Sequence, residues 1–200
     1  MSSLDSANAR ALDPVSPAVS RIALSRIMTQ ADVNLLGTVH GGVMMKLVDD
    51  AAGLVATRHS LGPAVTAAMD EMAFLFPVHV GELVHTYAQV NWTGRTSMEV
   101  GVRVEAEPWD VASGAPVHVA TAFLTFVAID ADGKPREVPP LAPENAEDER
   151  RFHEATIRRK HRLARRAAIT ASRISEVVAF EGTEAQAAGA EAAEGVVEGN

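Results

Sequence analysis

The sequence predicts an α+β fold in which an antiparallel sheet is wrapped around one long buried helix. The first observation is a single long apolar segment, residues 43–58, rich in Ala, Met and Leu and closed by a Gly-Pro stop. The second is a series of strand-like runs, bounded by turn residues, that follows it. One hydrophobic helix laid across a face of an antiparallel sheet satisfies the two-layer rule of domain architecture.

The elements follow in order along the chain. Residues 20–28 are typical of a first strand, and residues 29–40 form a loop. Apolar residues nearly encircle the helix, which predicts that it is buried on most sides. Apolar side chains on even positions from Met98 to Val104 show the period of a half-buried strand. We expect four later strands in an antiparallel, meander-like succession, at residues 65–76, 82–92, 97–106 and 117–130.

The two ends of the chain differ in composition from the middle. Residues 1–20 are polar and rich in Ala and Pro, so we expect a flexible segment that is not a secretory signal. Residues 21–140 then form the globular domain and residues 141–172 a charged helix. Residues 173–200 are acidic and rich in Ala, Gly and Glu, a composition typical of a disordered tail.

Composition excludes several classes of protein. The absence of cysteine excludes disulfides, thiolate metal sites and a Cys nucleophile. No stretch approaches the roughly 20 apolar residues of a membrane span, so we expect a cytoplasmic protein. The seven histidines lack metal-ligand spacing, which predicts no metal site. No Gly-x-Ser-x-Gly or Gly-x-Gly-x-x-Gly motif is present, so serine-hydrolase and dinucleotide chemistry are not expected.

Charge is distributed unevenly. Residues 150–166 contain eight basic residues and one acidic residue, so this segment carries +7 and the remainder of the chain −15. An acidic body with one basic stripe is not a general nucleic-acid binder, because that affinity scales with the number of phosphates neutralised. The stripe is either a solvated helix face or a contact for a small polyanion.

Two adjacent acidic residues in the helix point to different faces. Asp50 has Lys46 four positions earlier and is expected to pair with it. Asp49 has only apolar or small neighbours along the helix. Burying a carboxylate there costs folding free energy unless the carboxylate is hydrogen-bonded or has a role in function. Asp49 is therefore a candidate general base, with a structural cap or an intersubunit salt bridge as the alternative.

The loop before the helix supplies further candidates. The first N–H groups of a helix have no internal partner and attract anions, so Gly41 and Gly42 suit a ligand or a developing oxyanion. A tight turn is the alternative for this glycine pair. His40 is placed to cap the helix, and a loop residue such as Asn34 usually bonds its own backbone in a turn.

These residues belong to a longer pattern. Asn-x-x-Gly-x-x-x-Gly-Gly occupies residues 34–42, with Asp49 on the next helix. Phe-Leu-Phe-Pro follows at 74–77, Thr-Ser-Met-Glu-Val at 96–100 and Asp-Gly-Lys-Pro-Arg at 132–136. Over residues 21–166 the chain resembles the hotdog-fold acyl-CoA thioesterases of the brain-type cytosolic acyl-CoA hydrolase group.

The resemblance implies hydrolysis of the acyl-CoA thioester. By this likeness Asp49 matches the catalytic carboxylate, as base or nucleophile, and Asn34 matches the asparagine that positions water or the thioester. The Gly42 N–H would polarise the carbonyl. No cofactor is implied, because coenzyme A is part of the substrate and product.

The resemblance also implies a homodimer with continuous sheet pairing, commonly assembled as a trimer of dimers, that is, a hexamer. Asn34 of one subunit is then expected to meet Asp49 of the other. Residues near the substrate and the CoA path include His40, Gly41, Arg95, Thr96 and Ser97, and the CoA phosphates are expected near Arg158 and Arg159.

Three other interpretations remain open at this point. One is a hotdog protein that binds acyl-CoA without turnover; the presence of both Asn34 and Asp49 argues against it, because a sensor has no use for a buried base. A hotdog enoyl-CoA hydratase uses an Asp/His pair in a different loop pattern, which His40 beside Gly41 matches poorly. An interaction protein acting through the charged C-terminal region is the alternative from another class.

Overall fold

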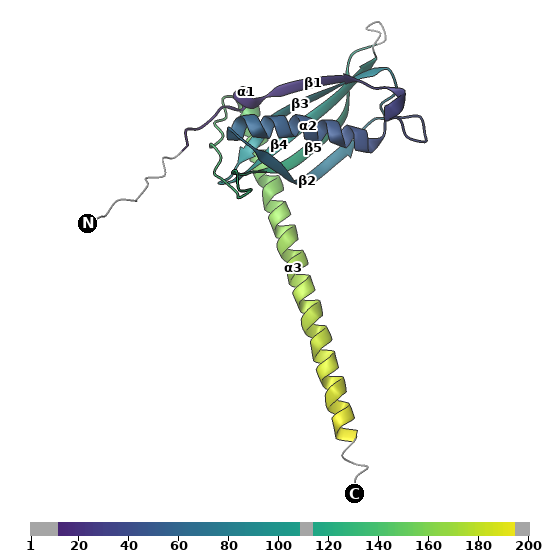
Figure 1. Ribbon diagram of the computed structural model, residues 1–200, viewed down its shortest axis with the longest axis vertical. Helices are drawn as coiled ribbons and strands as arrows, with labels where there is room; N and C mark the ends of the chain where they lie inside the picture. Colours follow the sequence, from purple (N-terminus) through teal and green to yellow (C-terminus); the bar gives the residue numbers. More distant parts are fainter. Residues whose placement is uncertain (1–11, 109–113, 195–200) are drawn as a thin grey trace, which may run out of the picture. The chain divides into compact units, whose positions relative to one another are not determined.

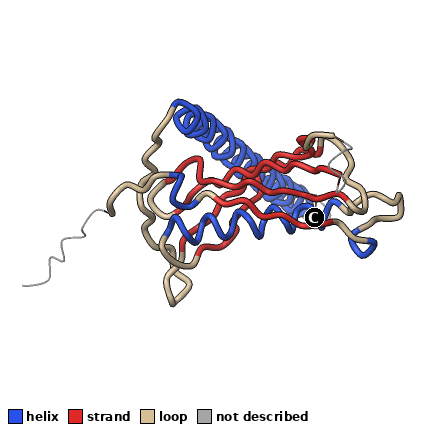
Figure 2. Tube along the Cα trace, turned by 90° about the horizontal axis from the view of Figure 1, so that it is seen from above, coloured by secondary structure: helices blue, strands red, loops and turns tan. Residues whose placement is uncertain are grey.

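The computed structural model describes residues 12–108 and 114–194, with side chains as far as Arg173. It forms two compact units, Met1–Thr156 and Ile157–Asn200. In the first unit five strands make one antiparallel sheet, and helix α2 runs along one face of it (Figures 1 and 2). The elements are α1 (Pro17–Ser20), β1 (Ile22–Ile27), a 3-10 turn (Gln30–Asp32), α2 (Gly41–Ser60), β2 (Ala64–Phe74), β3 (Glu82–Thr93), β4 (Ser97–Pro108), β5 (Val117–Ala128) and α3 (Ala146–Glu194).

Helix α2 is two residues longer at each end than the predicted 43–58. His40 is its N-cap residue, which extends the helix to Gly41. At the other end Leu61 adopts a left-handed conformation with φ of 57°. The Leu61 and Gly62 N–H groups then bond to carbonyls of the last helical turn, so the helix ends in a left-handed cap.

One face of α2 fills the core. Val48, Ala52 and Val55 are fully buried with the even-numbered side chains of β4, from Met98 to Val104. Elsewhere around the helix, Met45 is 43% and Leu54 48% exposed. The prediction that α2 is buried on most sides is therefore wrong for the single chain, because the sheet covers only one side of the helix.

The order of the strands corrects the predicted meander. Strands β3, β4 and β5 pair with their neighbours in sequence, but β2 pairs with β5 instead of β3, giving the order β1-β3-β4-β5-β2. The segment between β2 and β3 therefore crosses from one edge of the sheet toward the other. Sequence patterning identified the strands but not this pairing, because the choice of partner depends on contacts far apart in the chain.

The sheet face turned away from α2 is also partly covered. Glu99 and Asn91 are both 1% exposed, and Asn91 Nδ2 donates a hydrogen bond to Glu99 Oε1 at 3.3 Å. The segment after β5 lies here, since the Leu141 N–H donates to Thr93 Oγ1 at 2.8 Å. The middle of β4 is thus buried on both faces, whereas its alternating pattern predicted one buried face.

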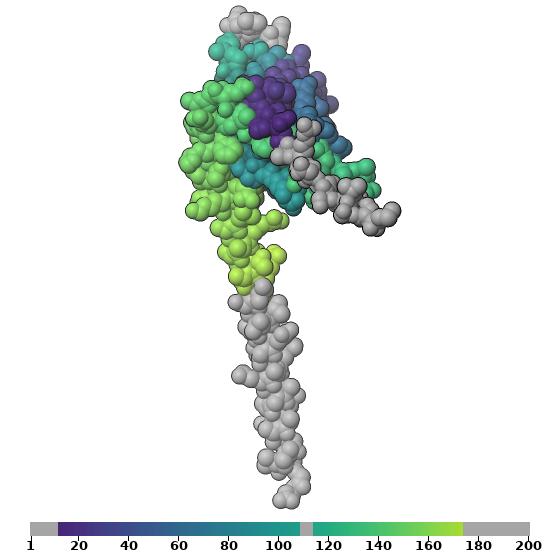
Figure 3. Space-filling view, turned by 90° about the vertical axis from the view of Figure 1, so that its left-hand side faces the viewer, coloured from purple at the N-terminus to yellow at the C-terminus, as the bar shows by residue number. Residues whose placement is uncertain are grey.

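Residues before β1 are held against the domain. The Val15 N–H donates to the Pro140 carbonyl at 2.8 Å, and the Ala142 N–H donates to the Val15 carbonyl at 2.9 Å. Figure 3 shows the first described residues, in purple, beside a later part of the chain in green. These two bonds hold Val15, which lies within residues 1–20, where a flexible segment was expected. Residues 1–11 lie outside the described part of the chain.

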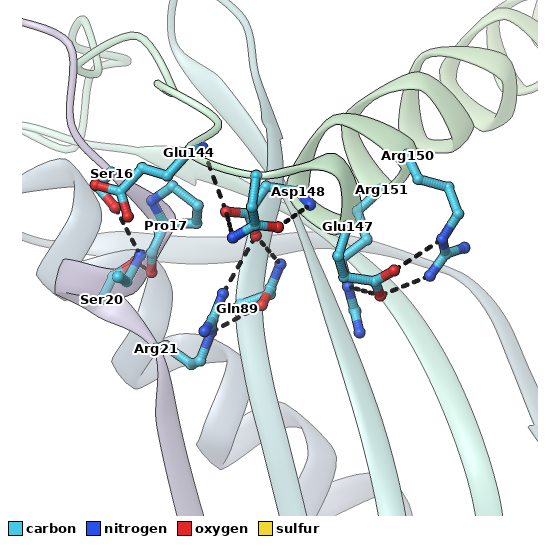
Figure 4. Close-up of polar contacts among 12 residues, drawn as sticks. Ser16, Pro17, Ser20, Arg21, Gln89, Glu144, Glu147, Asp148, Arg150 and Arg151 are labelled. Atoms are coloured by element: carbon cyan, nitrogen blue, oxygen red, sulfur yellow. Dashed lines mark hydrogen bonds and ion pairs between the residues drawn. The ribbon is translucent and has the colours of Figure 1, made fainter.

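The start of α3 is anchored by one carboxylate. The Asp148 side chain is only 2% exposed. It accepts hydrogen bonds from Arg21, which precedes β1, from Gln89 of β3 and from Asn145 (Figure 4). Asn145 Oδ1 in turn accepts from the Asp148 N–H at 3.0 Å, an N-cap contact.

Helix α3 extends to Glu194, beyond the boundary expected at residue 172. The segment past this boundary is rich in Ala and Glu, which have high helix propensities, and this explains a helix where an irregular tail was expected. Residues 195–200 lie outside the described part. Among the described residues, no helix is both long and apolar enough to cross a membrane.

Candidate active site

The N-terminal end of α2 is capped by His40. Its Nδ1 accepts a hydrogen bond from the Gly42 N–H at 2.8 Å, so the neutral ring carries its proton on Nε2. The predicted capping role of His40 is confirmed. The Gly42 N–H, expected to polarise a carbonyl, is therefore already occupied, and a substrate oxygen has to compete with the imidazole for it.

Gly41 offers a free donor at the same helix end. Among the described residues its N–H has no hydrogen-bond acceptor, as the helix geometry requires for the first turn. Gly41 also lines a cavity of about 370 Å³ whose other walls are apolar. The cavity thus places a helix N–H beside an apolar space, and its lining residues are Val39, Gly41, Met44, Phe74, Leu75, Phe76, Pro77, Val78 and Val119.

The two adjacent carboxylates of α2 have different surroundings, as predicted. Asp50 pairs with Lys46 across one helical turn, with Nζ and Oδ2 2.7 Å apart, and both side chains are exposed. Asp49 points to β2, where its Oδ1 accepts a hydrogen bond from the Thr66 hydroxyl at 2.7 Å. Asp49 is partly exposed in the single chain, not buried as its apolar helical neighbours suggested, because the sheet covers only the neighbouring face of α2.

Thr66 is a site residue that the sequence analysis missed. It lies on β2 at a register irregularity, since the pairing with β5 shifts between Thr66 and Ala68. Bulges of this kind are common beside active sites because they re-aim a side chain. The hydroxyl engages one oxygen of Asp49 and leaves the other oxygen available. A lone Thr at the start of a strand run carries no signal that sequence alone can detect.

Asn34 is fixed within its own loop, as the turn interpretation expected. Its Oδ1 accepts hydrogen bonds from the backbone N–H groups of Leu36 at 2.8 Å and Thr38 at 3.3 Å. Its Nδ2 donates to Thr38 Oγ1 at 3.0 Å. An amide nitrogen has two hydrogens, so one N–H of Asn34 is left to donate elsewhere. The loop contacts therefore determine that Asn34 presents a donor and not an acceptor.

The base of this loop is held by Asp32. Its carboxylate accepts from the Thr29 N–H and the Thr29 hydroxyl, each at 2.8 Å, and pairs with Arg26 at 2.6 Å. The Thr29 bonds, with the Arg26 charge, keep the pKa of Asp32 below its ordinary value. The Asp32 carbonyl accepts the His40 N–H at 2.8 Å, so the Asn34 loop and the start of α2 share this support.

The tip of the loop is apolar and fully exposed. Leu35 and Leu36, next to Asn34, are 106% and 87% exposed. Within the described residues no hydrogen bond joins Asn34 to Asp49. A single chain therefore supplies both residues without bringing them into contact.

The residues expected along the CoA path fall into two groups. Arg95, Thr96 and Ser97 lie in the turn between β3 and β4, where the Gly94 N–H donates to the Ser97 carbonyl at 2.7 Å and Arg95 is exposed. Arg158 and Arg159 lie on α3 in the second compact unit. Their contact with CoA phosphates stays a prediction.

A second cavity, of about 650 Å³, lies between β1, β3, β4 and the start of α3. Its three arginines are each paired with a carboxylate: Arg21 with Asp148, Arg103 with Glu105 and Arg151 with Glu147. Because these charges are internally compensated, the cavity lacks the excess positive charge of a CoA site. Across the described residues, no group of three or more His, Cys, Asp or Glu side chains is arranged to hold a metal.

Comparisons with known proteins all point to the same family, the acyl-CoA thioester hydrolases. The profile of the Thioesterase superfamily matches residues 36–112. The chain is 38% identical over 140 residues to the uncharacterized acyl-CoA thioester hydrolase YkhA of Bacillus subtilis, covering 70% of this chain and 80% of that protein. It is 36% identical over 154 residues to the cytosolic acyl coenzyme A thioester hydrolase of Mus musculus, covering 77% of this chain. The chain spans about 40% of the length of that curated relative and of its counterparts from Rattus norvegicus and Homo sapiens.

Solved structures share the fold. An apo-hexameric acyl-CoA thioesterase superposes with a TM-score of 0.74 at 35% identity, covering 78% of this chain and 99% of that one. Structures of an acyl-CoA hydrolase from Staphylococcus aureus give TM-scores of 0.72 to 0.75 at 31 to 33% identity, covering 79 to 84% of this chain and 96 to 98% of theirs. One holds butyryl coenzyme A and coenzyme A.

Three of the S. aureus structures are alanine variants of an asparagine, an aspartate and a threonine. Along that chain the aspartate follows the asparagine by 15 residues and the threonine follows the aspartate by 17. Asn34, Asp49 and Thr66 have the same separations here.

Proposed function

Because the chain belongs to the acyl-CoA thioester hydrolase family of the hotdog fold, we propose that it hydrolyses acyl-CoA to a free fatty acid and coenzyme A. The observation that carries this proposal is the Asp49–Thr66 contact, 2.7 Å long and at the spacing of the substituted S. aureus residues. A hydrogen bond that orients a base and leaves it able to reach a ligand is one of the geometric features of an active site.

Asp49 is the catalytic carboxylate of this proposal, and Thr66 is its positioning residue. The Thr66 hydroxyl holds Oδ1, which leaves Oδ2 for the reacting atoms. As a general base, Oδ2 takes a proton from water while the water oxygen forms a bond to the thioester carbon and the CoA thiolate leaves. As a nucleophile, Oδ2 forms an anhydride with expulsion of the thiolate, and water then hydrolyses the anhydride.

Asn34 contributes its remaining N–H, directed at the water or the thioester. We place this donor in the site of a second subunit, because the exposed leucines beside Asn34 suit a loop that packs against another chain. Strand β2 is an edge strand in the described sheet, which leaves it free for continuous pairing with a second copy. Relatives of known structure are hexameric, consistent with a trimer of dimers.

The α2 terminus supplies the electrostatic part. A thioester carbonyl oxygen at this end accepts a hydrogen bond from the Gly41 N–H. It also accepts one from the Gly42 N–H once it displaces His40 Nδ1 from that donor. The apolar cavity bordering Gly41 then takes the acyl group. The Arg95–Ser97 turn and the arginines at 158 and 159 are assigned to CoA. A cytosolic location is proposed from the names of the mammalian relatives.

The test is release of free thiol from acyl-CoA substrates of increasing chain length. Wild type should turn over, whereas Asp49→Asn should lose about two to four orders of magnitude in kcat, as expected for a general base. Asp50→Asn is the matched control, because that carboxylate points away from Asp49 and pairs with exposed Lys46; its rate should stay within about twofold. Equal losses in the two variants, or no turnover by folded wild type, contradict the proposal.

Isotope labelling separates the two chemical routes. In a single turnover in oxygen-18 water, a general base places the label only in the fatty acid. A nucleophilic Asp49 acquires label in its own carboxylate when water attacks the Asp49 carbonyl of the anhydride, which no general-base route can produce. Mass spectrometry of the peptide that contains Asp49 distinguishes these outcomes.

A further inference from the structure

A serine, a histidine and a glutamate are joined on the sheet face that is turned away from α2. Ser25 Oγ and His85 Nδ1 are 2.7 Å apart, and His85 Nε2 lies 3.3 Å from Glu107 Oε1. The three residues come from three adjacent strands, β1, β3 and β4. Ser25 lies directly opposite His85 in the strand pairing, and Glu107 is the diagonal neighbour of His85 on β4. None of them takes part in the proposed hydrolysis of acyl-CoA.

The glutamate determines how the other two residues are bonded. A carboxylate only accepts hydrogen bonds, so the neutral His85 ring carries its proton on Nε2, which faces Glu107. Nδ1 is then an acceptor, and the Ser25 hydroxyl is its donor. A hydroxyl that donates to a histidine, whose other nitrogen donates to a carboxylate, is the arrangement that activates serine as a nucleophile. It is defined by geometry and does not require a Gly-x-Ser-x-Gly motif.

The serine is open to a reactant, whereas its two supporting groups are partly buried. Ser25 is exposed, and the side chains of His85 and Glu107 are 17% and 31% exposed. The His85 ring also stacks on Tyr87, with the ring centroids 6.1 Å apart, which restricts its rotation. The group therefore meets two geometric requirements of a nucleophilic site, a bond from nucleophile to base and a bond from base to an orienting residue.

The backbone at the serine supplies a hydrogen-bond donor. The Met28 N–H donates to the Glu82 carbonyl at 2.9 Å, and inter-strand bonds alternate along an antiparallel pair. Even-numbered residues of β1 therefore direct their N–H groups at β3, and Ser25 directs its own away from β3. Since β1 is an edge strand of the described sheet, no strand there accepts the Ser25 N–H. This N–H is available to an oxyanion that forms at the serine.

The cavity of about 650 Å³ begins next to this group. Its walls include Ala23 and Tyr87, which lie two residues from Ser25 and His85 along the same strands and on the same face. The three arginines of the cavity are each paired with a carboxylate, so it carries no excess charge. Further lining residues are apolar: Ala18, Ile22 and Ala88. The cavity therefore suits an uncharged group better than an anion.

We propose that Ser25, His85 and Glu107 form a second hydrolytic site, which cleaves uncharged carboxylic esters through an acyl-serine. Ser25 Oγ bonds to the ester carbon while His85 Nδ1 takes the hydroxyl proton. This proton leaves with the alcohol as the carbon–oxygen bond breaks. Water then attacks the acyl carbon and gives a proton to His85, and that proton returns to Ser25 Oγ as the acid is released. Ser25 and His85 are the catalytic residues, and Glu107 is a positioning residue.

The first test is labelling of the full chain with an alkyl fluorophosphonate, which bonds to an activated serine with loss of fluoride. Mass spectrometry should find the label on the tryptic peptide of residues 22–26, which contains Ser25. His85→Gln should slow labelling by about 100-fold or more, because the general base is lost. His153→Gln, at an exposed histidine of α3, is the matched control and should label like wild type. Folded wild type without label on Ser25, or equal labelling of the two histidine variants, overturns the proposal.

The second test is turnover of 4-nitrophenyl acetate, an uncharged ester whose nitrophenolate release is measured by absorbance. All chains in this assay carry Asp49→Asn, so that the α2 carboxylate does not contribute. Ser25→Ala should lower the rate by about 100-fold or more, whereas Ser172→Ala, at an exposed serine of α3, should not change it. Equal rates in these two variants overturn the proposal.

The role of Glu107 is tested in the same assay. Glu107→Ala should lower the rate, and Glu107→Gln should restore most of it, because the amide oxygen still accepts the His85 Nε2–H. Equal rates in the alanine and glutamine variants contradict the positioning role. Thiol release from acyl-CoA, measured on chains that retain Asp49, should be the same for Ser25→Ala and wild type. A parallel loss of thiol release in Ser25→Ala refutes a separate site.

Discussion

The two ends of α2 are built in opposite ways. At the N-terminal end the Gly41 N–H, next to an apolar cavity, has no acceptor among the residues that the structure describes, and the preceding loop exposes two leucines. At the C-terminal end His59 and Ser60 are at most 1% exposed. There Arg136 Nη1 donates to the Ser60 carbonyl at 2.6 Å and Nη2 donates to its hydroxyl at 3.2 Å.

The two ends of the helix therefore have different roles: the N-terminal end is open to a ligand, and the C-terminal end fixes the helix in the domain. A helix terminus that leaves donors unpaired is available to a ligand, whereas a terminus with paired carbonyls fixes the helix in the domain. Asp49 lies about two turns from the open end, so the anchored end holds its carboxylate in register with Thr66. Changes at the open end should therefore reduce the rate and leave stability intact, and changes at the anchored end should do the reverse.

The largest effect is expected at the open end, from Asn34→Asp. An aspartate keeps the oxygen that accepts the Leu36 and Thr38 N–H groups, so the loop should hold its shape. It lacks the spare N–H, and loss of one such donor typically lowers kcat by about 100- to 1,000-fold. Steady-state thiol release measures the rate, and an unchanged thermal midpoint shows that the fold is intact.

Mixing subunits tests whether this donor acts across the dimer. In a hybrid of Asn34→Asp and Asp49→Asn subunits, one site carries both changes and the other carries neither. Random reassembly of equal amounts should restore about a quarter of wild-type activity. No recovery from reassembled hybrids would place Asn34 and Asp49 of one chain in one site and refute the shared arrangement.

A substitution at the anchored end should instead lower the stability of the fold. Arg136→Met keeps most of the side-chain length but removes the donors to Ser60 and to the Ile129 carbonyl. Leaving a buried carbonyl unpaired costs about 1–3 kcal/mol, which lowers Tm by about 2–10 °C in a domain of this size. Differential scanning calorimetry gives the shift. The kcat of the folded variant should stay near wild type, and a large loss of kcat at unchanged Tm contradicts the comparison.

The anchored end also shows why some features were predictable from sequence and others were not. Helix α2 and the strands follow from local periodicity and turn residues, which short segments carry by themselves. The role of Arg136 depends on a contact 76 residues away in the chain, and the pairing of β2 with β5 is also long-range. Neither the Arg136–Ser60 contact nor the β2–β5 pairing can be predicted from the residues next to it in sequence.

The same distinction holds for the candidate site. The separation of Asp49 from Asp50 follows from helical geometry, and the capping role of His40 follows from its position before a helix. Thr66 could not be predicted from local sequence, because its contact with Asp49 depends on an irregularity in the strand pairing. Position alone predicted that His40 caps the helix, but that the Gly42 N–H is the donor it accepts depends on the rotamer of His40.

The smallest expected effect is the pH dependence of the anchored end, which resides in His59. Burial lowers the pKa of His59, and its Nε2–H bond to the Pro139 carbonyl at 3.1 Å opposes that shift. Below an ordinary histidine pKa of 6.5 the unfolded chain takes up the proton before the folded chain does. The stability contribution is therefore complete above this pH and is lost as the pH falls, by at most about 1.4 kcal/mol per pH unit.

Urea unfolding between about pH 7.5 and 5.5 tests this sign. His59→Gln retains a side-chain donor but does not titrate, so its free energy of unfolding should fall less steeply than that of wild type as the pH drops. His153→Gln is the matched control, because His153 is exposed on α3 and should leave the wild-type slope unchanged. If His59→Gln and wild type share one slope, the buried ring does not set the acid limit. The anchored end of α2 then owes its stability to Arg136 and the left-handed cap alone.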